Sequence, residues 1–358
     1  MGEASRFPFF LPKMKFTATL LDWFDTCKRD LPWRGETDPY KIWISEVILQ
    51  QTRVVQGIGY YYRFIETFPT VASLAAAPEA EVLKLWQGLG YYSRARNLHA
   101  AARQMVERHN GVFPSDYAGI RAQKGVGDYT AAAIASIAFG LPHPAVDGNV
   151  LRFVARYQGI FDNIAAPATR KLVETTCQKW IPNDRPGDFN QAMMEMGAMM
   201  CTPKNPDCPK CPFASECYAF QHQQVEQLPV KQKTITVKNR YFHYLIFLHN
   251  DQTILQRRAE NDIWRELYEF PLVELDGVQF DIINYLNDNK IEYTEEPRLV
   301  WQTQHQLTHR RIFAYFYVVS VKCLPPLSEH QQIVPVGRLR DYAVAKVTER
   351  ALQRVFQQ

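Results

Sequence analysis

Long apolar runs and a strong excess of one charge are both missing from this sequence. No stretch of about 18 or more apolar residues occurs, so we expect no segment that spans a membrane. The run Phe7–Leu11 is short and broken by Pro8, and it lacks the apolar length and the cleavage site of a signal peptide. Lys plus Arg outnumber Asp plus Glu by only 41 to 37, which permits a polyanionic partner without requiring one. These absences favour a cytoplasmic enzyme or binding protein.

The composition also lacks the marks of a disordered chain. Apolar residues make up 46 % and aromatic residues 13 % of the 358 residues, which is too apolar for disorder and too long for one ordinary domain. Apolar periodicity predicts helices over 40–55, 72–89, 93–109, 129–139, 149–157, 169–180 and 189–200. Beyond Cys217 it predicts strands over 241–248, 253–257 and 311–321 and helices over 280–289 and 343–357. We therefore predict an all-α domain over residues 1–220, a linker over 221–233 and an α+β domain over 234–358.

The cysteines are seven, an odd number in a chain without an export signal, which argues against a disulfide framework. Four of them fall within one short, proline-rich segment: Cys201, Cys208, Cys211 and Cys217. Four thiolates in so short a loop can close around one metal centre. The spacing contains a single CxxC pair and leaves zinc and a [4Fe–4S] cluster both open.

Two carboxylates are candidate catalytic groups. Glu46 is the one acidic residue in the apolar helical segment 43–52, where burial would raise its pKa and allow general-acid catalysis near neutral pH. The alternative is a Glu46 side chain that reaches solvent at the edge of the apolar stripe. Asp147 precedes a helix that it can cap, and a helix N-terminus favours its ionised form. One protonated and one ionised carboxylate make the pair that cleaves glycosidic bonds.

A glycine turn between two helical runs is a candidate contact for nucleic acid. It consists of Gly125, Val126 and Gly127 and is flanked by Arg121 and Lys124. The backbone amides of such a turn can approach a phosphate closely, and the next helix points its N-terminus at the anion. An ordinary helix–helix turn has the same short pattern.

The loop 88–94 has an apolar tip and two adjacent tyrosines, Tyr91 and Tyr92. Such a loop can insert a side chain between stacked bases. The alternative is a turn whose tyrosines pack in the core.

Six sequence blocks together identify a family: WISEVILQQTRV, GLGYYSRARNL, KGVGDYTAAAI, AVDGNVLR, FNQAMMEMGAMMC and the four-cysteine loop. From about Leu20 to its C-terminus, the chain resembles the adenine DNA glycosylases of the helix-hairpin-helix superfamily. The resemblance implies an all-α glycosylase domain with a [4Fe–4S] loop, followed by an α+β Nudix-like domain. It implies a monofunctional base-excision enzyme that removes adenine mispaired with 8-oxoguanine or guanine from double-stranded DNA and leaves an abasic site. We accordingly expect a monomeric, nucleoid-associated protein of the bacterial cytoplasm.

The same resemblance implies roles for individual residues. Glu46 matches the acid that protonates adenine N7, Asp147 the carboxylate that stabilises the oxocarbenium ion, and Asn149 its support. Tyr129 stands where the related endonuclease III carries a Schiff-base lysine, so we expect no strong β-lyase activity. The four cysteines match the ligands of a [4Fe–4S] cluster. Arg34 and Gln191 match residues that line the adenine pocket. Four other positions match residues that probe or intercalate beside 8-oxoguanine: Gln51, Thr52, Leu89 and Tyr91.

The chain departs from the family pattern at two places. Gln123-Lys124 precedes the hairpin glycines where the family usually has Leu-Pro, and the glycines that contact phosphate are kept. In the C-terminal domain, Leu307-Thr308-His309 replaces the frequent Phe-Ser-His, and Thr308 keeps a hydroxyl for 8-oxoguanine. We expect Thr308 and His309 to contact the damaged base.

The Nudix-like domain carries only a fragment of the signature of a working hydrolase. The segment 265–269 reads Arg-Glu-Leu-Tyr-Glu, and Phe270 replaces the glutamate that should follow. We therefore predict that this domain reads a damaged base. A Nudix-type hydrolase of oxidised nucleotides is the alternative, and a non-enzymatic DNA-binding module with a structural metal is a third hypothesis.

Overall fold

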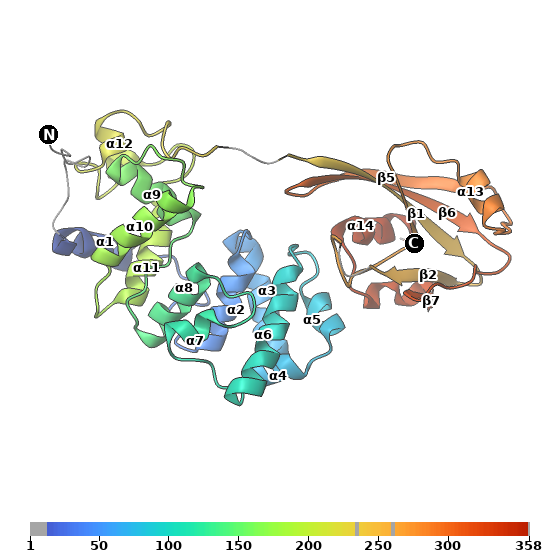
Figure 1. The fold of residues 1–358 in the computed structure, drawn as a ribbon, viewed down its shortest axis with the longest axis horizontal. Coiled ribbons are helices and arrows are strands. Elements are labelled where there is room, and N and C mark those ends of the chain that lie inside the picture. Colours follow the sequence, from blue (N-terminus) through green and yellow to red (C-terminus); the bar gives the residue numbers. More distant parts are fainter. Residues whose placement is uncertain (1–12, 233–235, 259–261, 357–358) are drawn as a thin grey trace. The chain divides into compact units, whose positions relative to one another are not determined.

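The computed structural model describes residues 13–232, 236–258 and 262–356, and the chain divides into two compact units (Figure 1). The first unit comprises residues 1–76 and 100–233, and the second comprises residues 77–99 and 234–358. The short helical segment 77–99 is therefore part of the unit that holds the strands. Within the described ranges, no helix has the length and apolar character needed to cross a bilayer.

The first unit is helical, as the periodicity predicts. Its helices are α1 (Lys13–Cys27), α2 (Pro39–Leu49), α3 (Val54–Thr67), α4 (Val71–Ala76), α6 (Ser93–His109) from residue 100 onward, α7 (Tyr117–Arg121), α8 (Asp128–Phe139), α9 (Gly148–Gln158), α10 (Pro167–Trp180), α11 (Pro186–Glu195) and α12 (Tyr218–Gln221). A π-helical turn, Met196–Met200, continues α11. Helix α2 begins at Pro39 because the Asp38 carboxylate accepts a hydrogen bond from the Tyr40 amide at 2.9 Å.

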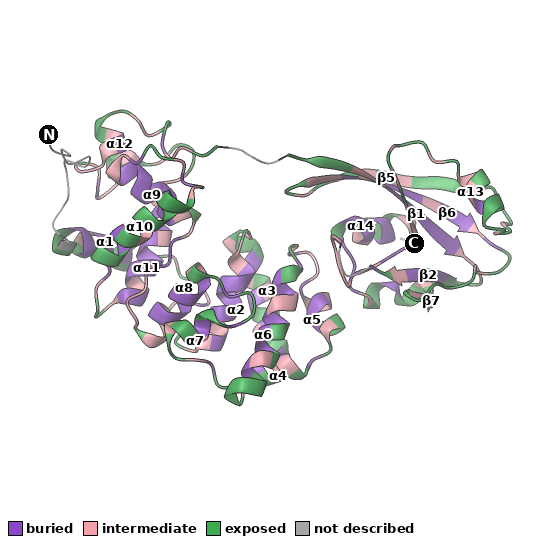
Figure 2. Cartoon of the chain, in the orientation of Figure 1, coloured by how far each residue is buried: buried purple, intermediate pink, exposed green. Residues whose placement is uncertain are grey.

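Helix α2 is one of the most buried helices of this unit. Eight of its 11 residues are buried, and its ribbon is purple over most of its length in Figure 2. A helix that is apolar on all sides has to be surrounded by other elements. Helix α8 packs against it, and the alanines from Ala131 to Ala133 allow the close approach. This arrangement carries residues of α2 and α8 into the interior together.

A second cluster of buried side chains joins α1, α9, α10 and α11. Its centre is aromatic: the rings of Phe16 and Trp180 stack at 4.0 Å between centroids, and Phe213 lies 4.8 Å from Phe16. Offset-stacked and tilted pairs of this kind add to the free energy gained from burial alone. Because Phe213 lies between Cys211 and Cys217, this core also anchors the four-cysteine segment.

Two predicted helices are each divided in the structure. The helix expected over 72–89 is wrong as a single element, because Pro78 separates α4 from α5 (Glu79–Leu85) and the residue before a proline avoids helical geometry. The helix expected over 40–55 ends at Leu49, where Gln51 adopts a positive φ of 56°, and α3 then begins at Val54. In both places the apolar pattern runs through the break and gives no sign of it.

The second unit contains the strands. A four-stranded sheet has the order β4-β1-β6-β5 and a three-stranded sheet the order β3-β2-β7. The strands are β1 (Lys238–Leu248), β2 (Gln252–Arg257), β3 (Tyr268–Glu269), β4 (Leu272–Leu275), β5 (Arg298–Gln306), β6 (Arg310–Ser320) and β7 (Gln331–Pro335). The helices α13 (Ile282–Asp288) and α14 (Lys346–Val355) confirm the α+β prediction. Strands β1 and β6 run parallel, and β5 and β6 form a hairpin whose turn holds Thr308 and His309.

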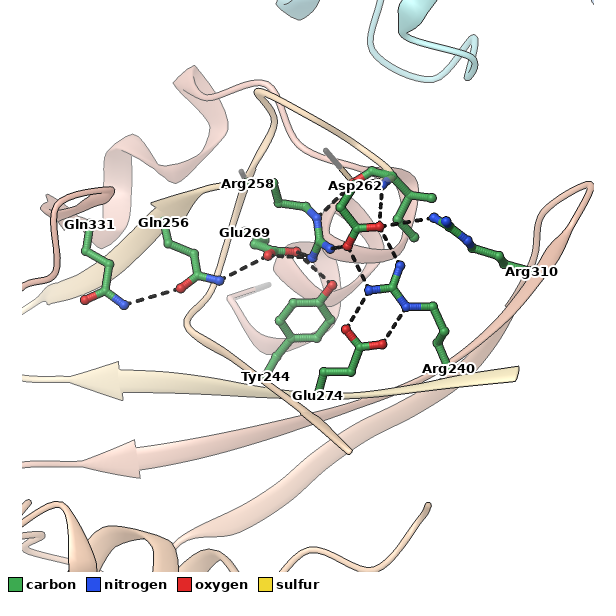
Figure 3. Close-up of polar contacts among 10 residues, drawn as sticks. Arg240, Tyr244, Gln256, Arg258, Asp262, Glu269, Glu274, Arg310 and Gln331 are labelled. Carbon is green, nitrogen blue, oxygen red and sulfur yellow. Dashed lines mark hydrogen bonds and ion pairs between the residues drawn. The ribbon is translucent and has the colours of Figure 1, made fainter. Parts of the chain in front are cut away.

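A cluster of charged side chains lies beside β1 in this unit (Figure 3). The Arg258 guanidinium contacts both oxygens of the buried Glu269 carboxylate, at 2.7 and 2.8 Å. Glu269 also accepts hydrogen bonds from Tyr244 and Gln256. A buried carboxylate needs partners of this kind to offset its desolvation. Glu269, the last residue of the Nudix-like fragment, is therefore engaged within the fold.

Candidate active site

A cavity of about 190 Å³ lies within the first unit, among residues of α2, α8, α9 and α11 and the segment 29–34. Its lining includes all the residues that the sequence singles out for catalysis and for the adenine pocket, namely Arg34, Glu46, Tyr129, Asp147, Asn149 and Gln191, and also Thr52, which was expected beside 8-oxoguanine. These residues lie as much as 157 positions apart in the chain, so only the fold brings them together.

Glu46 lies on α2 and is nearly enclosed, with 8 % of its surface exposed. Burial raises the pKa of its carboxyl to about 7, and the nearby Asp147 acts in the same direction. The Tyr129 hydroxyl donates a hydrogen bond to Oε2 of Glu46 at 2.7 Å, which together with Arg34 favours the charged form and limits the rise. The solvent-facing alternative for Glu46 is therefore wrong. At neutral pH this carboxyl can hold or release a proton.

Asp147 is the N-cap of α9, as predicted. Its Oδ1 accepts hydrogen bonds from the backbone amides of Asn149 and Val150, both at 2.8 Å, and Oδ2 accepts one from Asn149 Nδ2 at 2.7 Å. These donors favour the carboxylate, but burial outweighs them and raises the pKa of Asp147. The prediction that the two pKa values move in opposite directions is therefore wrong. What separates the two carboxyls is their partners, because Asp147 has three donors and Glu46 has one.

Asn149 is held in turn by Arg152. The Arg152 guanidinium donates to Asn149 Oδ1 at 3.0 Å, to the Gly197 carbonyl at 2.6 Å and to the Cys201 carbonyl at 2.8 Å. Gly197 lies against α9 so closely that a Cβ there would stand 2.6 Å from Asn149 Cβ. The start of α9, the π-helical turn and the first cysteine are therefore one tightly packed unit.

The lining of the cavity includes a further acidic residue that the sequence patterns did not single out. Glu195 is 2 % exposed and pairs with Arg29 at 2.7 Å and with Arg34 at 3.1 Å. Arg34 also donates a hydrogen bond to Gln191. Like Glu46, Glu195 is a lone acidic residue in an apolar helical segment, so the same signal would have found it. Through Arg34 it holds the polar edge of the cavity in place.

The remaining expected contacts lie outside this cavity. Gln51 is exposed beside Thr52, at the break between α2 and α3. Gly125 and Gly127 line a groove formed mainly by α8, the loop 143–146 and α10, and Val126 is buried. Arg121 closes this turn through a hydrogen bond to the Val126 carbonyl at 2.8 Å.

Within the second unit, four expected residues line one pocket: Leu89, Tyr91, Thr308 and His309. The hydroxyls of Tyr91 and Thr308 are 3.0 Å apart, within hydrogen-bonding distance. Tyr91 is half exposed and has a positive φ of 48°, a strained backbone conformation for a residue with a side chain. Trp264 and His305 add aromatic surface to the same pocket.

The four cysteines of the 201–217 segment line one small cavity together with Phe153, Arg156 and other residues. Arg156 contacts Cys201 Sγ at 3.4 Å and the Thr202 carbonyl at 2.7 Å. Four thiols around one cavity with a guanidinium beside them are a donor set that suits a thiolate-bound, negatively charged metal centre. Among the described residues, no three Cys, His, Asp or Glu side chains are grouped as a site for a metal ion.

Comparisons with known proteins follow this division of the chain. The family model described as HhH-GPD superfamily base excision DNA repair protein matches residues 44–183, and a NUDIX domain model matches residues 243–354. Adenine DNA glycosylase of Buchnera aphidicola subsp. Baizongia pistaciae is 35 % identical over 301 residues, which cover 83 % of this chain and 84 % of that protein. Adenine DNA glycosylase of Homo sapiens is 44 % identical over 222 residues, which cover 60 % of this chain and 41 % of that protein.

Two solved structures resemble the helical part. A thermostable thymine-DNA glycosylase has a TM-score of 0.55 and 29 % identity, covering 59 % of this chain and 97 % of that one. A trapped covalent intermediate of endonuclease III with DNA has a TM-score of 0.51 and 25 % identity, and the match covers 60 % of this chain and 99 % of that one. The predicted pair of folds, a helix-hairpin-helix glycosylase domain and a Nudix-like domain, is confirmed.

Proposed function

The chain belongs to the adenine DNA glycosylase family of base-excision repair enzymes, and from this premise we propose that it removes adenine mispaired with 8-oxoguanine or guanine. The observation that carries the proposal is the position of Glu46 and Asp147, which come from α2 and the start of α9 and line one cavity. Two carboxyl groups at one site are the catalytic groups that glycosidic hydrolysis commonly uses. An adenine must leave the base stack to reach them.

The proposed reaction begins with Glu46 in its protonated form. Its proton passes to N7 of the adenine, and the electron pair of the N-glycosidic bond moves onto the departing base. The Asp147 carboxylate stabilises the positive charge that develops on the sugar. Water then adds to the sugar C1′, its proton passes to the Glu46 carboxylate, and an abasic site remains. Asn149 keeps Asp147 oriented through the 2.7 Å hydrogen bond.

Tyr129 supports Glu46 and makes the enzyme monofunctional. Burial raises the pKa of Tyr129 well above its ordinary value, so the phenol stays neutral and donates its hydrogen bond to the carboxyl oxygen. A neutral phenol cannot form the imine through which an amine nucleophile continues to strand cleavage. We therefore propose hydrolysis of the glycosidic bond without strong β-lyase activity.

DNA binding is assigned to three surfaces. Gly125 and Gly127 line a groove, and their amides are proposed to contact the phosphate backbone. Gln51, Thr52, Leu89 and Tyr91 are proposed to probe or intercalate beside 8-oxoguanine. Thr308 and His309 are proposed to contact the damaged base, which is supported by the short distance between the Thr308 and Tyr91 hydroxyls.

The four cysteines are proposed to hold a [4Fe–4S] cluster. Bound there, the cluster supplies four iron–thiolate bonds that tie the 201–217 loop to the core. Arg156 contributes positive charge beside Cys201 and links it to the Leu228 carbonyl at 2.8 Å. We propose that the protein acts as a monomer on double-stranded DNA.

The contacts of Glu269 argue against nucleotide hydrolysis by the second unit. Its fragment of the Nudix signature ends on Glu269, and this carboxylate is buried and accepts hydrogen bonds from Arg258, Tyr244 and Gln256 (Figure 3). Residues 263–269 form a turn and the short strand β3 rather than a helix. A Glu269 in this state is not available to a magnesium ion.

A glycosylase assay tests the proposed function. Duplexes carry adenine opposite 8-oxoguanine, guanine or thymine, and alkali after incubation reveals abasic sites as strand breaks. We expect adenine loss opposite 8-oxoguanine and guanine, and none with the Asp147→Asn variant, which keeps the helix cap but lacks the charge. Intact adenine in every duplex, or full activity of D147N, would contradict the proposal.

A further inference from the structure

The loop that delivers Asp147 to the active site has little means of holding its own shape. Residues 141–146 join α8 to α9 without helix or strand geometry. Pro142 and Pro144 lack backbone N–H groups, and the backbone hydrogen bond within the loop runs from the His143 amide to the Leu141 carbonyl at 2.8 Å. Asp147 follows directly. The position of its carboxylate therefore depends on what fixes this loop from outside.

Asn190 of α11 supplies that fixation from within the core. Its side chain is 1 % exposed. Its Oδ1 accepts a hydrogen bond from the Ala145 amide at 2.9 Å, and its Nδ2 donates to the His143 carbonyl at 2.8 Å and to Ser136 Oγ at 2.8 Å. Because one loop partner is a donor and the other an acceptor, the amide fits in one orientation only. The loop is thereby tied to α11 and α8 at once.

The loop has further contacts of two kinds. The His143 ring stacks on Tyr117 at 4.3 Å between centroids, and Ala145 and Val146 are buried in apolar clusters. The other side-chain hydrogen bonds come from the surface. Gln178 donates to the Pro142 carbonyl at 2.9 Å and Arg170 to the Val146 carbonyl at 3.1 Å, and both side chains are exposed. Exposed contacts compete with water, whereas a buried amide that loses its partner incurs the full desolvation cost. Asn190 also directly precedes Gln191, which lines the active-site cavity. Two consecutive residues of α11 thus contact the loop before Asp147 and the active-site cavity.

We infer that Asn190 is a positioning residue for catalysis, which sets the placement of Asp147 by holding residues 143–145. This inference rests on the proposed role of Asp147. Asn190 does not line the active-site cavity, and we expect its effect in the chemical step. Because His143 and Pro144 line the groove beside Gly125 and Gly127, the affinity for DNA is measured separately. A displacement of about 1 Å at a catalytic group can reduce the rate by about 10²-fold.

The test compares Asn190→Ala with wild type in single-turnover excision of adenine opposite 8-oxoguanine, alongside affinity for a duplex with a non-cleavable adenosine analogue. We expect the excision rate of N190A to fall by about 10²-fold while the affinity stays near that of wild type. Ser136→Ala is the matched control, because it removes one buried partner of Asn190 and leaves both loop contacts intact. S136A should excise at the wild-type rate. An unchanged N190A rate, or an equal loss in S136A, would overturn the inference.

Asn190→Asp, which conserves volume, provides a second measurement if N190A does not fold. The ionised carboxylate can accept from the Ala145 amide but repels the His143 carbonyl, whereas the protonated carboxyl can donate to it. The ratio of the N190D rate to the wild-type rate should therefore rise as pH falls, and a ratio that does not change with pH contradicts the inference. Wild-type excision is a separate readout: its absence refutes the proposed function, whereas active wild type with equally active N190A refutes only the positioning role.

Discussion

Replacing Glu46 by glutamine should abolish excision and at the same time stabilise the fold at alkaline pH. The structure places this carboxyl in a buried cavity where its pKa rises from 4.5 to about 7. In the unfolded chain the carboxyl loses its proton near its ordinary pKa. Above that pH the folded state holds either a proton that the unfolded state has released or a poorly solvated charge. Both penalise folding.

The size of the effect follows from the shift. A difference of about 2.5 pKa units corresponds to about 3 kcal/mol, reached in full once pH exceeds the folded-state pKa of about 7. Glutamine has no charge to desolvate, and its amide oxygen can still accept the hydrogen bond from Tyr129. We therefore expect Glu46→Gln to raise the free energy of unfolding at pH 8 by about 2 kcal/mol. Near pH 4 the two proteins should be equally stable.

Two measurements on the same proteins test this reasoning. Urea unfolding at pH 4 and pH 8 gives the stability difference, and single-turnover excision gives the chemical step. Loss of a general acid should reduce the excision rate by at least about 10²-fold while the affinity for duplex DNA persists. Wild-type excision should itself decline above pH 7 as Glu46 loses its proton. A destabilised E46Q at pH 8, or one that excises at the wild-type rate, would refute the assignment.

Further predictions concern the neighbours of this group and the two other sites. Tyr129→Phe removes a hydrogen bond that favours the ionised Glu46, so the alkaline decline of the excision rate should move to higher pH. Thr308→Ala removes a hydroxyl 3.0 Å from that of Tyr91 and should reduce the preference for 8-oxoguanine over guanine by about fivefold, measured as a ratio of affinities. Cys211→Ser should lower the iron content of the purified protein and its Tm, whereas Cys323→Ser, at an exposed position outside the cluster loop, should change neither.

Much of this architecture is visible in the sequence because local signals and packing agree. The cap and first-turn proline of α2, the N-cap at Asp147 and the glycine turn at 125–127 all lie where their residue types require. The burial of Glu46 also follows from its apolar neighbours on the helix. In these places each residue type already indicates its environment.

Other features depend on tertiary packing and could not be predicted from the local pattern. The break after Leu49 has no proline or glycine to mark it, whereas Pro78 does mark the break between α4 and α5. The pKa of Asp147 rises because the cavity walls exclude water, which the helix N-terminus alone does not indicate. The contacts of Asn190 join residues as much as 54 positions apart, so no local pattern marks it. Strand β5 has mostly exposed, polar positions, and its pairing with β6 defines it.

The N-cap of α9 has a consequence for how variation at this position should be interpreted. The Asp147 carboxylate caps helix α9 and is also proposed to stabilise the charge on the sugar. Substitutions at this one position can therefore affect folding and catalysis separately. Replacement by serine or asparagine would preserve the helix cap but abolish excision, whereas alanine would impair both folding and excision. A saturation library at Asp147, scored for both protein abundance and repair, should therefore separate into two classes of inactive protein. A residue with only a catalytic role would give a single class of inactive variants.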